Sequence, residues 1–208
     1  MVGNEKFVAS SEMSVDSNAI ILNEKYKVIE DVYQAYGRGS FKIDLGCGYV
    51  KPPGFIGIDN LSGEASQIPN VQNAPDILMN LDEAAFPFPD NSCDEVRSSH
   101  FLEHSQLMHI LNESYRVLRP GGTFLFAVPY ANSAEGMYPG HIQFLTEKWF
   151  YENLTFQKNF KIEHEEYFPS ADYLKLPFFL RMLIPFKFAR TFLFNACWQM
   201  IISCSVKK

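Results

Sequence analysis

Several patterns that would place a chain in a well-known class are missing from this sequence. The four cysteines include no C-x-x-C pair, which suits reduced thiols in a cytosolic protein better than a disulfide framework or a zinc site. No uninterrupted apolar run reaches the ~18 residues of a transmembrane helix, and residues 1–18 lack the apolar core of a signal peptide. We therefore expect a cytoplasmic protein.

Basic residues are also scarce. Eighteen lysines and arginines stand against 24 acidic residues, and the formal net charge is −6. This balance argues against an extended phosphate-binding face, so we expect no nucleic-acid partner. Hydrophobic residues make up 47% of the 208 positions, which is enough for a full core and predicts a single domain over residues 1–208.

The chain lacks both common phosphate-binding patterns. The Walker sequence G-x-x-x-x-G-K-[ST] is absent. A G-x-G-x-x-G fingerprint would have to open a helix. Gly48 is instead followed by a segment with Pro52 and Pro53, which block a helix N-terminus of the usual kind. The sequence therefore indicates no site for a pyrophosphate.

The sequence does contain a strand that ends in glycines, followed by a second strand that ends on a carboxylate. Residues 42–48 read Lys-Ile-Asp-Leu-Gly-Cys-Gly, and residues 55–59 read Phe-Ile-Gly-Ile-Asp. Glycine lets a backbone approach a ligand closely, and an acidic residue at the end of the next strand can accept hydrogen bonds from a ribose diol. The pair predicts a nucleoside-containing cofactor at the carboxyl edge of a parallel sheet.

Strand patterns and helix patterns alternate along the chain. Predicted helices cover residues 23–36, 107–118 and 146–153, and predicted strands cover residues 41–45, 55–59, 76–80, 93–98, 123–128, 160–165 and 198–206. Strands that alternate with helices predict an α/β fold with a parallel, doubly wound sheet.

Three further segments carry a family resemblance. Residues 82–94 resemble D-A-x-x-L-P-F-x-D-x-S-F-D, residues 98–104 contain the turn h-x-L-E-H, and residues 116–122 resemble R-V-L-K-P-G-G. With D-x-G-x-G at residues 44–48, they resemble the motifs of class I S-adenosylmethionine (SAM)-dependent methyltransferases, in particular the small-molecule type 11 family. The resemblance implies a Rossmann-like, mostly parallel seven-stranded sheet with a C-terminal antiparallel strand. It also implies SAM as cofactor and S-adenosylhomocysteine as product.

The resemblance also assigns residues to the cofactor. Asp44 would order the glycine turn near the methionine moiety, Asp59 would bind the ribose diol, and Asp82 would accept from the adenine amino group. Cys47 is interpreted as a small filler of the turn, because no base stands beside it in the sequence. The complete predicted cofactor set is Asp44, Gly46, Cys47, Gly48, Asp59, Asn60, Leu61, Leu81, Asp82, Ser99 and His100.

One spacing departs from the family pattern. Only 15 positions separate Asp44 from Asp59, where the family more often has a longer segment with a helix after the glycine turn. That helix must be shortened or replaced by the loop with Pro52 and Pro53. The departure puts in doubt the usual contribution of a helix dipole to the cofactor's carboxylate.

Residues 100–104 also match the H-x-x-E-H pattern of a metal site. The order of the motifs gives a better account. Family members with this turn use no metal as a rule, so we predict none. In this interpretation Ser99 and His100 line the methionine end of the cofactor, while Glu103 and His104 hold the turn.

A second histidine segment follows the strand at residues 123–128. Residues 138–146 resemble the family's D-P-x-H-x-x-x-F-T loop. His141 is the candidate general base or substrate-orienting donor, because an imidazole can take a hydroxyl proton near neutral pH. The alternative is a structural histidine that locks the loop.

Residues 165–197 lie outside the resemblance and are predicted to form a Phe-rich helical insertion between the last two strands. Within them, residues 173–194 combine phenylalanines with four basic residues, and two prolines divide them into short helices. Three interpretations stay open. The segment is a lid over an apolar substrate, a homodimer surface, or a peripheral membrane contact.

The predicted function is transfer of the SAM methyl group to a small-molecule or lipid-like acceptor through an oxygen, nitrogen or carbon nucleophile. A non-catalytic SAM-binding partner subunit is the alternative, although the glycines and acidic residues of the site are retained. A nucleic-acid methyltransferase is less favoured, because residues 98–101 lack an N-P-P-Y-type tetrad. One fold serves many acceptors, so the sequence does not identify the acceptor.

Overall fold

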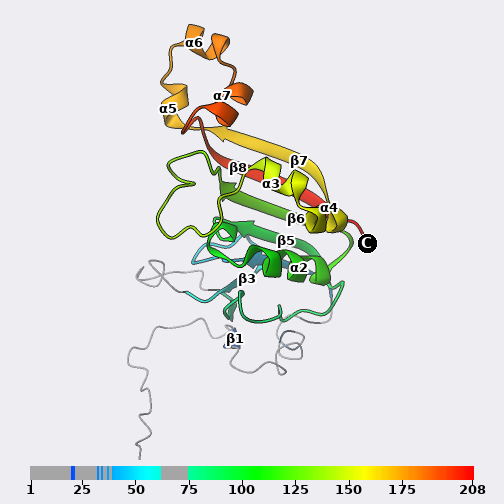
Figure 1. Ribbon diagram of the computed structural model, residues 1–208. Helices are drawn as coiled ribbons and strands as arrows, with labels where there is room; N and C mark the ends of the chain where they lie inside the picture. Colours follow the sequence, from blue (N-terminus) through cyan, green and yellow to red (C-terminus); the bar gives the residue numbers. More distant parts are fainter. Residues whose placement is uncertain (1–19, 22–31, 33, 35–36, 38, 62–74) are drawn as a thin grey trace, which may run out of the picture.

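A mixed sheet of eight strands forms the centre of the molecule (Figure 1). The computed structural model describes residues 20–21, 32, 34, 37, 39–61 and 75–208, so most of the helix predicted over residues 23–36 lies outside it. The strands occur in the order β1-β4-β3-β2-β5-β6-β8-β7. Their bounds are β1 Ile20–Ile21, β2 Phe41–Leu45, β3 Ile56–Asp59, β4 Ile77–Leu78, β5 Cys93–Ser99, β6 Leu118–Pro129, β7 Phe160–Pro169 and β8 Cys197–Val206.

The strand directions follow the predicted class. All neighbouring pairs from β1 to β6 are parallel, and β8 runs antiparallel between β6 and β7. The predicted Rossmann-like, mostly parallel sheet with an antiparallel C-terminal strand is therefore confirmed. The seven expected strands are present, and β1 adds a two-residue strand beside β4 at the edge of the sheet.

The strand predicted over residues 76–80 is shorter than expected. Only the two residues of β4 pair with β3. Asp76 uses its side chain to accept the Gly57 N–H at 2.7 Å, and the side chain of Asn80 accepts the Asp82 N–H at 3.1 Å. Side chains that bond nearby backbone groups compete with the strand ladder and favour turns, which explains the short strand.

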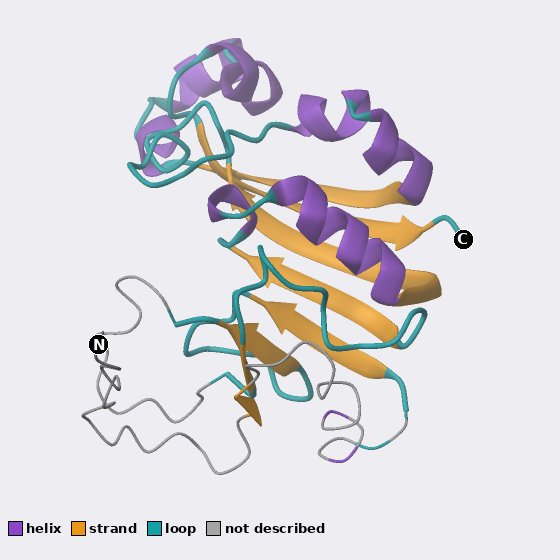
Figure 2. Ribbon diagram, turned by 60° about the horizontal axis from the view of Figure 1, so that its bottom comes forward, coloured by secondary structure: helices purple, strands orange, loops and turns teal. Residues whose placement is uncertain are grey.

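Helices cover one face of the sheet (Figure 2). They are α2 at Leu107–Val117, α3 at Glu147–Glu152 and α4 at Leu154–Asn159, with a short 3-10 helix, η2, at Leu102–His104. The core beneath them is rich in phenylalanine, and the rings of Phe126 and Phe156 both contact Phe150. The helix predicted over residues 146–153 ends at Asn153, whose side chain accepts the Phe156 N–H at 2.9 Å and starts α4.

Three short helices connect β7 to β8. We call residues 170–196 the cap; it contains α5 at Ala171–Leu174, α6 at Phe178–Leu183 and α7 at Phe186–Phe192. Its two ends meet, because Ser170 N–H donates to Ala196 O at 2.9 Å. Since β7 runs parallel to β6, the cap leaves the sheet at the carboxyl ends of the parallel strands, the carboxyl edge (Figure 1). No helix in the described part of the chain is long and apolar enough to cross a membrane.

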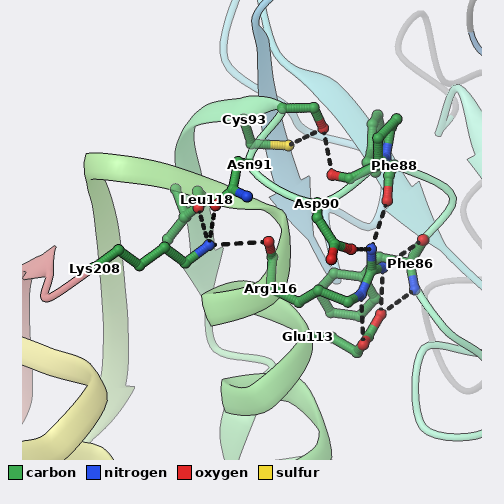
Figure 3. A network of polar contacts seen from close by, with 11 residues as sticks. Phe86, Phe88, Asp90, Asn91, Cys93, Glu113, Arg116, Leu118 and Lys208 are labelled. Atoms are coloured by element: carbon green, nitrogen blue, oxygen red, sulfur yellow. Dashed lines mark hydrogen bonds and ion pairs between the residues drawn. The ribbon is translucent and has the colours of Figure 1, made fainter.

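Arg116, near the end of α2, organises the opposite, amino edge of the sheet (Figure 3). Each of its five N–H groups has an acceptor at 2.7–2.9 Å: the two Glu113 oxygens, Asp90, and the carbonyls of Phe86 and Phe88. Burial alone would raise the pKa of Glu113, but its hydrogen bonds with Arg116 and with the Phe86 N–H lower that pKa. We call this set the Arg116 network. It ties the loop before β5 to α2.

Candidate functional site

The glycine turn follows β2 at the carboxyl edge. Gly46 and Gly48 have φ values of +64° and +54°, a conformation that favours glycine. A Cβ at Gly46 would lie 2.3 Å from the Phe101 side chain, so there is no room for one. The N–H groups of Gly46 and Cys47 donate to Ile58 O, which ties the turn to β3.

Asp59 ends β3 beside that turn. Its Oδ2 atom accepts the Gly48 N–H at 2.8 Å, and its Oδ1 atom accepts the Leu61 N–H at 2.6 Å. Leu61 has a φ of +51°, an uncommon conformation for a residue other than glycine. A carboxylate has about four lone-pair positions. Asp59 is therefore held in place and keeps the capacity to accept from further donors such as hydroxyls.

Asp44 lies inside the sheet, one position before the end of β2. The residue is 3% exposed, and its Oδ1 atom has no hydrogen-bond partner among the described residues. Burial raises the pKa of Asp44 from 3.8 to about 6; the charge of Arg97 opposes this rise, and the charge of Asp59 adds to it. A buried carboxylate with an open acceptor position suits a cationic group of a ligand.

The turn after β4 is bonded to the start of α2 and to the end of β3. Asp82 Oδ1 accepts the Gln106 N–H at 2.7 Å, just before α2. Met79 N–H donates to the Asp59 carbonyl at 3.1 Å. The turn with Leu81 and Asp82 is therefore fixed beside Asp59, although the side chain of Leu81 is buried in the core.

Sequence reasoning did not single out Gly57, in the middle of β3. A Cβ there would lie 2.7 Å from Cys47 Sγ, so β3 needs a glycine to make room for the cysteine. A glycine inside a strand pattern often marks such a close approach, and this was the available signal. Burial raises the pKa of Cys47 far above its usual value, which suits a filler of the turn and not a nucleophile.

The turn after β5 has an unusual backbone conformation. His100 has a φ of +53°, and its N–H donates to Ala127 O at 2.9 Å. Residues other than glycine are uncommon in this region and cluster at functional sites. Because Phe101 packs against Gly46, the turn that contains Ser99 and His100 lies beside the glycine turn.

This turn faces the loop after β6, and three side chains meet there: Glu103, His104 and His141. We call them the Glu103 cluster. One ligand atom from each of the three side chains lies within 4.8 Å of those of the other two. Glu103 is 2% exposed, and neither carboxylate oxygen has a hydrogen-bond partner among the described residues. His100 Nδ1 lies 3.5 Å from Glu103 Oε1, an ion-pair distance too long for a good hydrogen bond. Its contact with Glu103 raises the pKa of His100, although burial opposes the rise.

The two histidines of the cluster are anchored by backbone carbonyls. His104 Nδ1 lies 3.2 Å from Gly140 O, and His141 Nδ1 lies 3.3 Å from Gly136 O. Their rings meet edge to face at a centroid distance of 4.6 Å. Sequence reasoning considered the two residues separately. The missed signal is that each follows one of two neighbouring parallel strands, β5 and β6, whose carboxyl ends share an edge.

Known proteins resemble this chain in sequence and in fold. Residues 43–126 match the family model of a methyltransferase domain, a range that runs from β2 to β6 and includes the glycine turn and Asp59. Over residues 43–126 the chain matches a methyltransferase domain, and its fold is similar to that of a SAM-dependent methyltransferase. No curated protein sequence matches the chain.

Solved structures resemble the chain over most of its length. A SAM-dependent methyltransferase from Archaeoglobus fulgidus has a TM-score of 0.59 and 16% identity, with 88% of this chain and 94% of that chain covered. The YcgJ protein from Bacillus subtilis has a TM-score of 0.52 and 17% identity, covering 82% and 93%. The cyclase SpnF has a TM-score of 0.51 and 17% identity, covering 85% and 78%. At these identities the likeness concerns the fold alone, and the fold is shared with a protein named for another reaction.

The match to a methyltransferase domain implies SAM as the cofactor, and the residues at the carboxyl edge suit its chemistry. The glycine turn leaves space where a side chain would otherwise stand. Asp59 can accept from hydroxyls, and Asp44 offers a buried, open oxygen to a cationic amino group. The contact that each residue makes with SAM stays a prediction.

Proposed function

We propose that this methyltransferase transfers the SAM methyl group to a hydroxyl of a lipid-like acceptor. The observation that carries the proposal is the cap. It leaves the sheet at the edge that also holds the glycine turn, Asp59 and the Glu103 cluster, and it presents large apolar side chains to solvent. An apolar surface of this kind usually serves a ligand, a partner or a bilayer.

In this proposal SAM extends across the ends of β2, β3 and β4. Asp59 accepts from the ribose hydroxyls, and Asp44 faces the methionine moiety across the glycine turn. Asp82 reaches the adenine amino group with the oxygen that does not hold Gln106. Leu81 contributes its backbone, because its side chain is in the core. The remaining contacts come from Gly46, Cys47, Gly48, Asn60, Leu61, Ser99 and His100.

The chemical step needs alignment and a destination for one proton. SAM would supply the methyl group: the acceptor oxygen would form the new C–O bond as the S–CH₃ bond breaks with its electron pair left on sulfur, and the hydroxyl proton would pass to a base. Holding the oxygen in line with that bond can supply several of the ~7–11 kcal/mol attributed to proximity. His141 is the predicted base. When its Nδ1–H donates to Gly136 O, the lone pair lies on Nε2.

The composition of the cap supports a lipid-like acceptor. Phe178 is 71% exposed and Leu183 is 75% exposed. The other exposed large apolar residues of the cap are Leu174, Phe179, Met182, Phe188, Phe192, Leu193 and Phe194. Residues 171–194 contain four basic residues and one acidic residue, in a chain with a net charge of −6. A basic, apolar surface on an acidic protein suits an anionic membrane surface.

The cap is joined to the loop that carries His141. Asn132 Nδ2 donates to Leu193 O at 3.0 Å, and Asn195 N–H donates to Asn132 O at 2.9 Å. Asn195 Oδ1 accepts the Ala134 N–H at 3.0 Å. These bonds support an arrangement in which an acceptor held by the cap presents its hydroxyl to the Glu103 cluster.

Liposome flotation tests the membrane contact. The protein should float with vesicles that contain anionic lipid and less with zwitterionic vesicles. The double variant Phe178→Asp, Leu183→Asp should lose flotation, because it places charge in the exposed apolar face. Leu154→Asp is the matched control, since this side chain is 82% exposed and belongs to α4, a helix that lies away from the cap (Figure 1). If the wild type does not float but forms a dimer in light scattering, and the double variant is a monomer, then the cap contacts a second copy of the chain and not a membrane.

Labelled SAM tests the reaction itself. With the methyl group labelled, incubation with a total lipid extract and with a polar metabolite extract should put the label into lipid. Label in the polar fraction alone would overturn the lipid-like acceptor. Label in neither fraction, with SAM bound in a calorimetric titration, would support the non-catalytic alternative.

A further inference from the structure

We propose that Glu103, His104 and His141 bind a divalent transition-metal ion of the zinc type. Their ligand atoms already lie within 4.8 Å of one another. Zn–N and Zn–O bonds of ~2.0–2.2 Å place tetrahedral ligands about 3.5 Å apart. Small side-chain rotations therefore complete the site, and His104 has room to rotate because it is exposed.

The state of Glu103 is the second observation that points to an ion. Its carboxylate is almost fully buried, yet both oxygens lack a hydrogen-bond partner among the described residues. Buried polar groups are nearly always paired, and an isolated buried carboxylate is strongly unfavourable. His100 approaches only Oε1, at 3.5 Å, and leaves Oε2 open. A bound cation would satisfy the remaining oxygen.

The two histidines have the surroundings that metal ligands require. Metal-binding histidines commonly donate their other ring N–H to a backbone carbonyl, which fixes the tautomer and the ring. Gly140 O and Gly136 O occupy these positions beside the Nδ1 atoms of His104 and His141. The Nε2 lone pair of each ring is then the one available to a metal ion.

The backbone holds the two ligand-bearing segments together. The N–H groups of Ile142 and Gln143 both donate to the Glu103 carbonyl, at 2.8 and 3.0 Å. Gly140 has a φ of +105°, a conformation that favours glycine. At Gly136 a Cβ would lie 2.3 Å from Tyr130 O, so a side chain has no room there. The loop therefore depends on glycine at both carbonyls that anchor the histidines.

Two imidazoles and one carboxylate form a known ligand set of catalytic zinc, which leaves a position for a water or a substrate. An acceptor hydroxyl in that position would lose its proton to solvent more readily, because the ion lowers its pKa. His141 would then act as a ligand and not as a base. This role of the ion rests on the proposed function, whereas the binding of the ion does not.

Metal titration without SAM or acceptor tests the site. Chelator-treated protein should take up one equivalent of Zn²⁺ by calorimetry, and Co²⁺ should give visible absorption typical of a site with nitrogen ligands. Glu103→Gln and His104→Ala should each weaken Zn²⁺ binding by at least about 10–100-fold, the scale seen when the surroundings of a metal site are disturbed. His164→Ala, which removes an exposed histidine on β7, should bind like the wild type.

Each outcome of this titration decides the proposal. The metal site is supported if the wild type and His164→Ala bind Zn²⁺ stoichiometrically and the two cluster variants do not. No stoichiometric uptake by the wild type would overturn it, as would equal affinity in His104→Ala. His104→Ala keeps the test valid if Glu103→Gln fails to fold, because the His104 side chain is exposed. Zn²⁺ binding without label transfer to lipid would leave the metal site standing and refute only the proposed function.

Discussion

The two edges of the sheet use charged residues in opposite ways. At the amino edge, every N–H of Arg116 has an acceptor, and Glu113 receives both Arg116 and a backbone N–H. At the carboxyl edge, Asp44 and Glu103 are more deeply buried but keep oxygens without a partner among the described residues. The first edge fixes the fold, and the second keeps its charges available to a ligand.

This difference has an energetic consequence. A buried charge that lacks a partner lowers the stability of the free protein, whereas a fully bonded one is tolerated. Sites that bind charged ligands often accept this loss, and the rest of the fold must offset it. Single substitutions at the amino edge should therefore mainly change the free energy of unfolding, whereas those at the carboxyl edge should mainly change activity or SAM affinity.

His141→Ala should have the largest effect, and it should act on activity. Turnover should fall by about 10²–10⁴-fold, the range expected when a residue that handles the proton is lost. The free energy of unfolding should change little, because the His141 side chain adds only a long hydrogen bond, at 3.3 Å to Gly136 O, to its ring contacts with His104 and Tyr138. Initial rates with labelled SAM and urea unfolding measure the two quantities. A joint loss of activity and stability would assign His141 to holding the loop.

Arg116→Leu should act on stability instead. Removing the guanidinium leaves the Glu113 carboxylate with only the Phe86 N–H and takes a donor from the Phe86 and Phe88 carbonyls, so the free energy of unfolding should fall by about 2–4 kcal/mol. The control is Arg119→Leu, which removes a more exposed ion pair with Asp94 and should cost less than about 1 kcal/mol. SAM affinity of the folded Arg116 variant should equal that of the wild type. A weaker affinity would mean that the two edges are coupled.

Asp59→Ala should weaken SAM binding by roughly 1.5–3 kcal/mol, the scale of hydrogen bonds to a charged group. Its carboxylate holds the N–H groups of Gly48 and Leu61 and is predicted to bind the ribose. Asp90→Ala is the control at the amino edge, where the carboxylate bonds Arg116. Calorimetric titration with SAM measures both variants. Unchanged affinity in Asp59→Ala would refute the assignment of this residue to the cofactor.

Asp44→Asn should produce the smallest effect, and it should depend on pH. Burial raises the pKa of Asp44 to about 6, so the folded state favours the neutral carboxyl group. The contribution of Asp44 to the free energy of unfolding is therefore highest below about pH 4 and falls as the pH rises through 6 and the group ionises. The amide cannot ionise, and the full pKa rise corresponds to about 3 kcal/mol. With this figure discounted for solvent screening, the variant without SAM should gain about 1–2 kcal/mol relative to the wild type between pH 4 and 8. Urea unfolding across this range measures the difference. A constant difference would mean that Asp44 does not titrate there.

Much of the fold was predictable because its signals are local. Alternating strand and helix patterns gave seven of the eight strands, and Pro177 and Pro185 stand directly before α6 and α7. The early end of β4 and the start of α4 directly after α3 were not predictable. They depend on side chains of Asp76, Asn80 and Asn153 that bond backbone groups, and many sequences with these residues make no such bond.

The candidate site divides in the same way. The glycine turn and Asp59 stand next to each other in the sequence pattern, and the structure places them side by side. The meeting of Glu103 and His141 is a tertiary contact between two loops, and neither residue indicates the other in the sequence. The H-x-x-E-H pattern pairs His100 with His104, whereas the structure pairs His104 with His141.

The closed ends of the cap affect how this enzyme can diversify. Because Ser170 and Ala196 are joined by a hydrogen bond, the cap begins and ends at one point, at neighbouring ends of β7 and β8. A segment inserted at such a point can be lengthened, shortened or replaced with little loss of closure entropy and without a shift in strand register. With the cap holding the acceptor as proposed, acceptor preference would be inherited as an exchangeable segment, while the glycine turn and the paired strands stay unchanged. Chimeras between related enzymes with their junctions at residues 170 and 196 would be the natural way to exploit it.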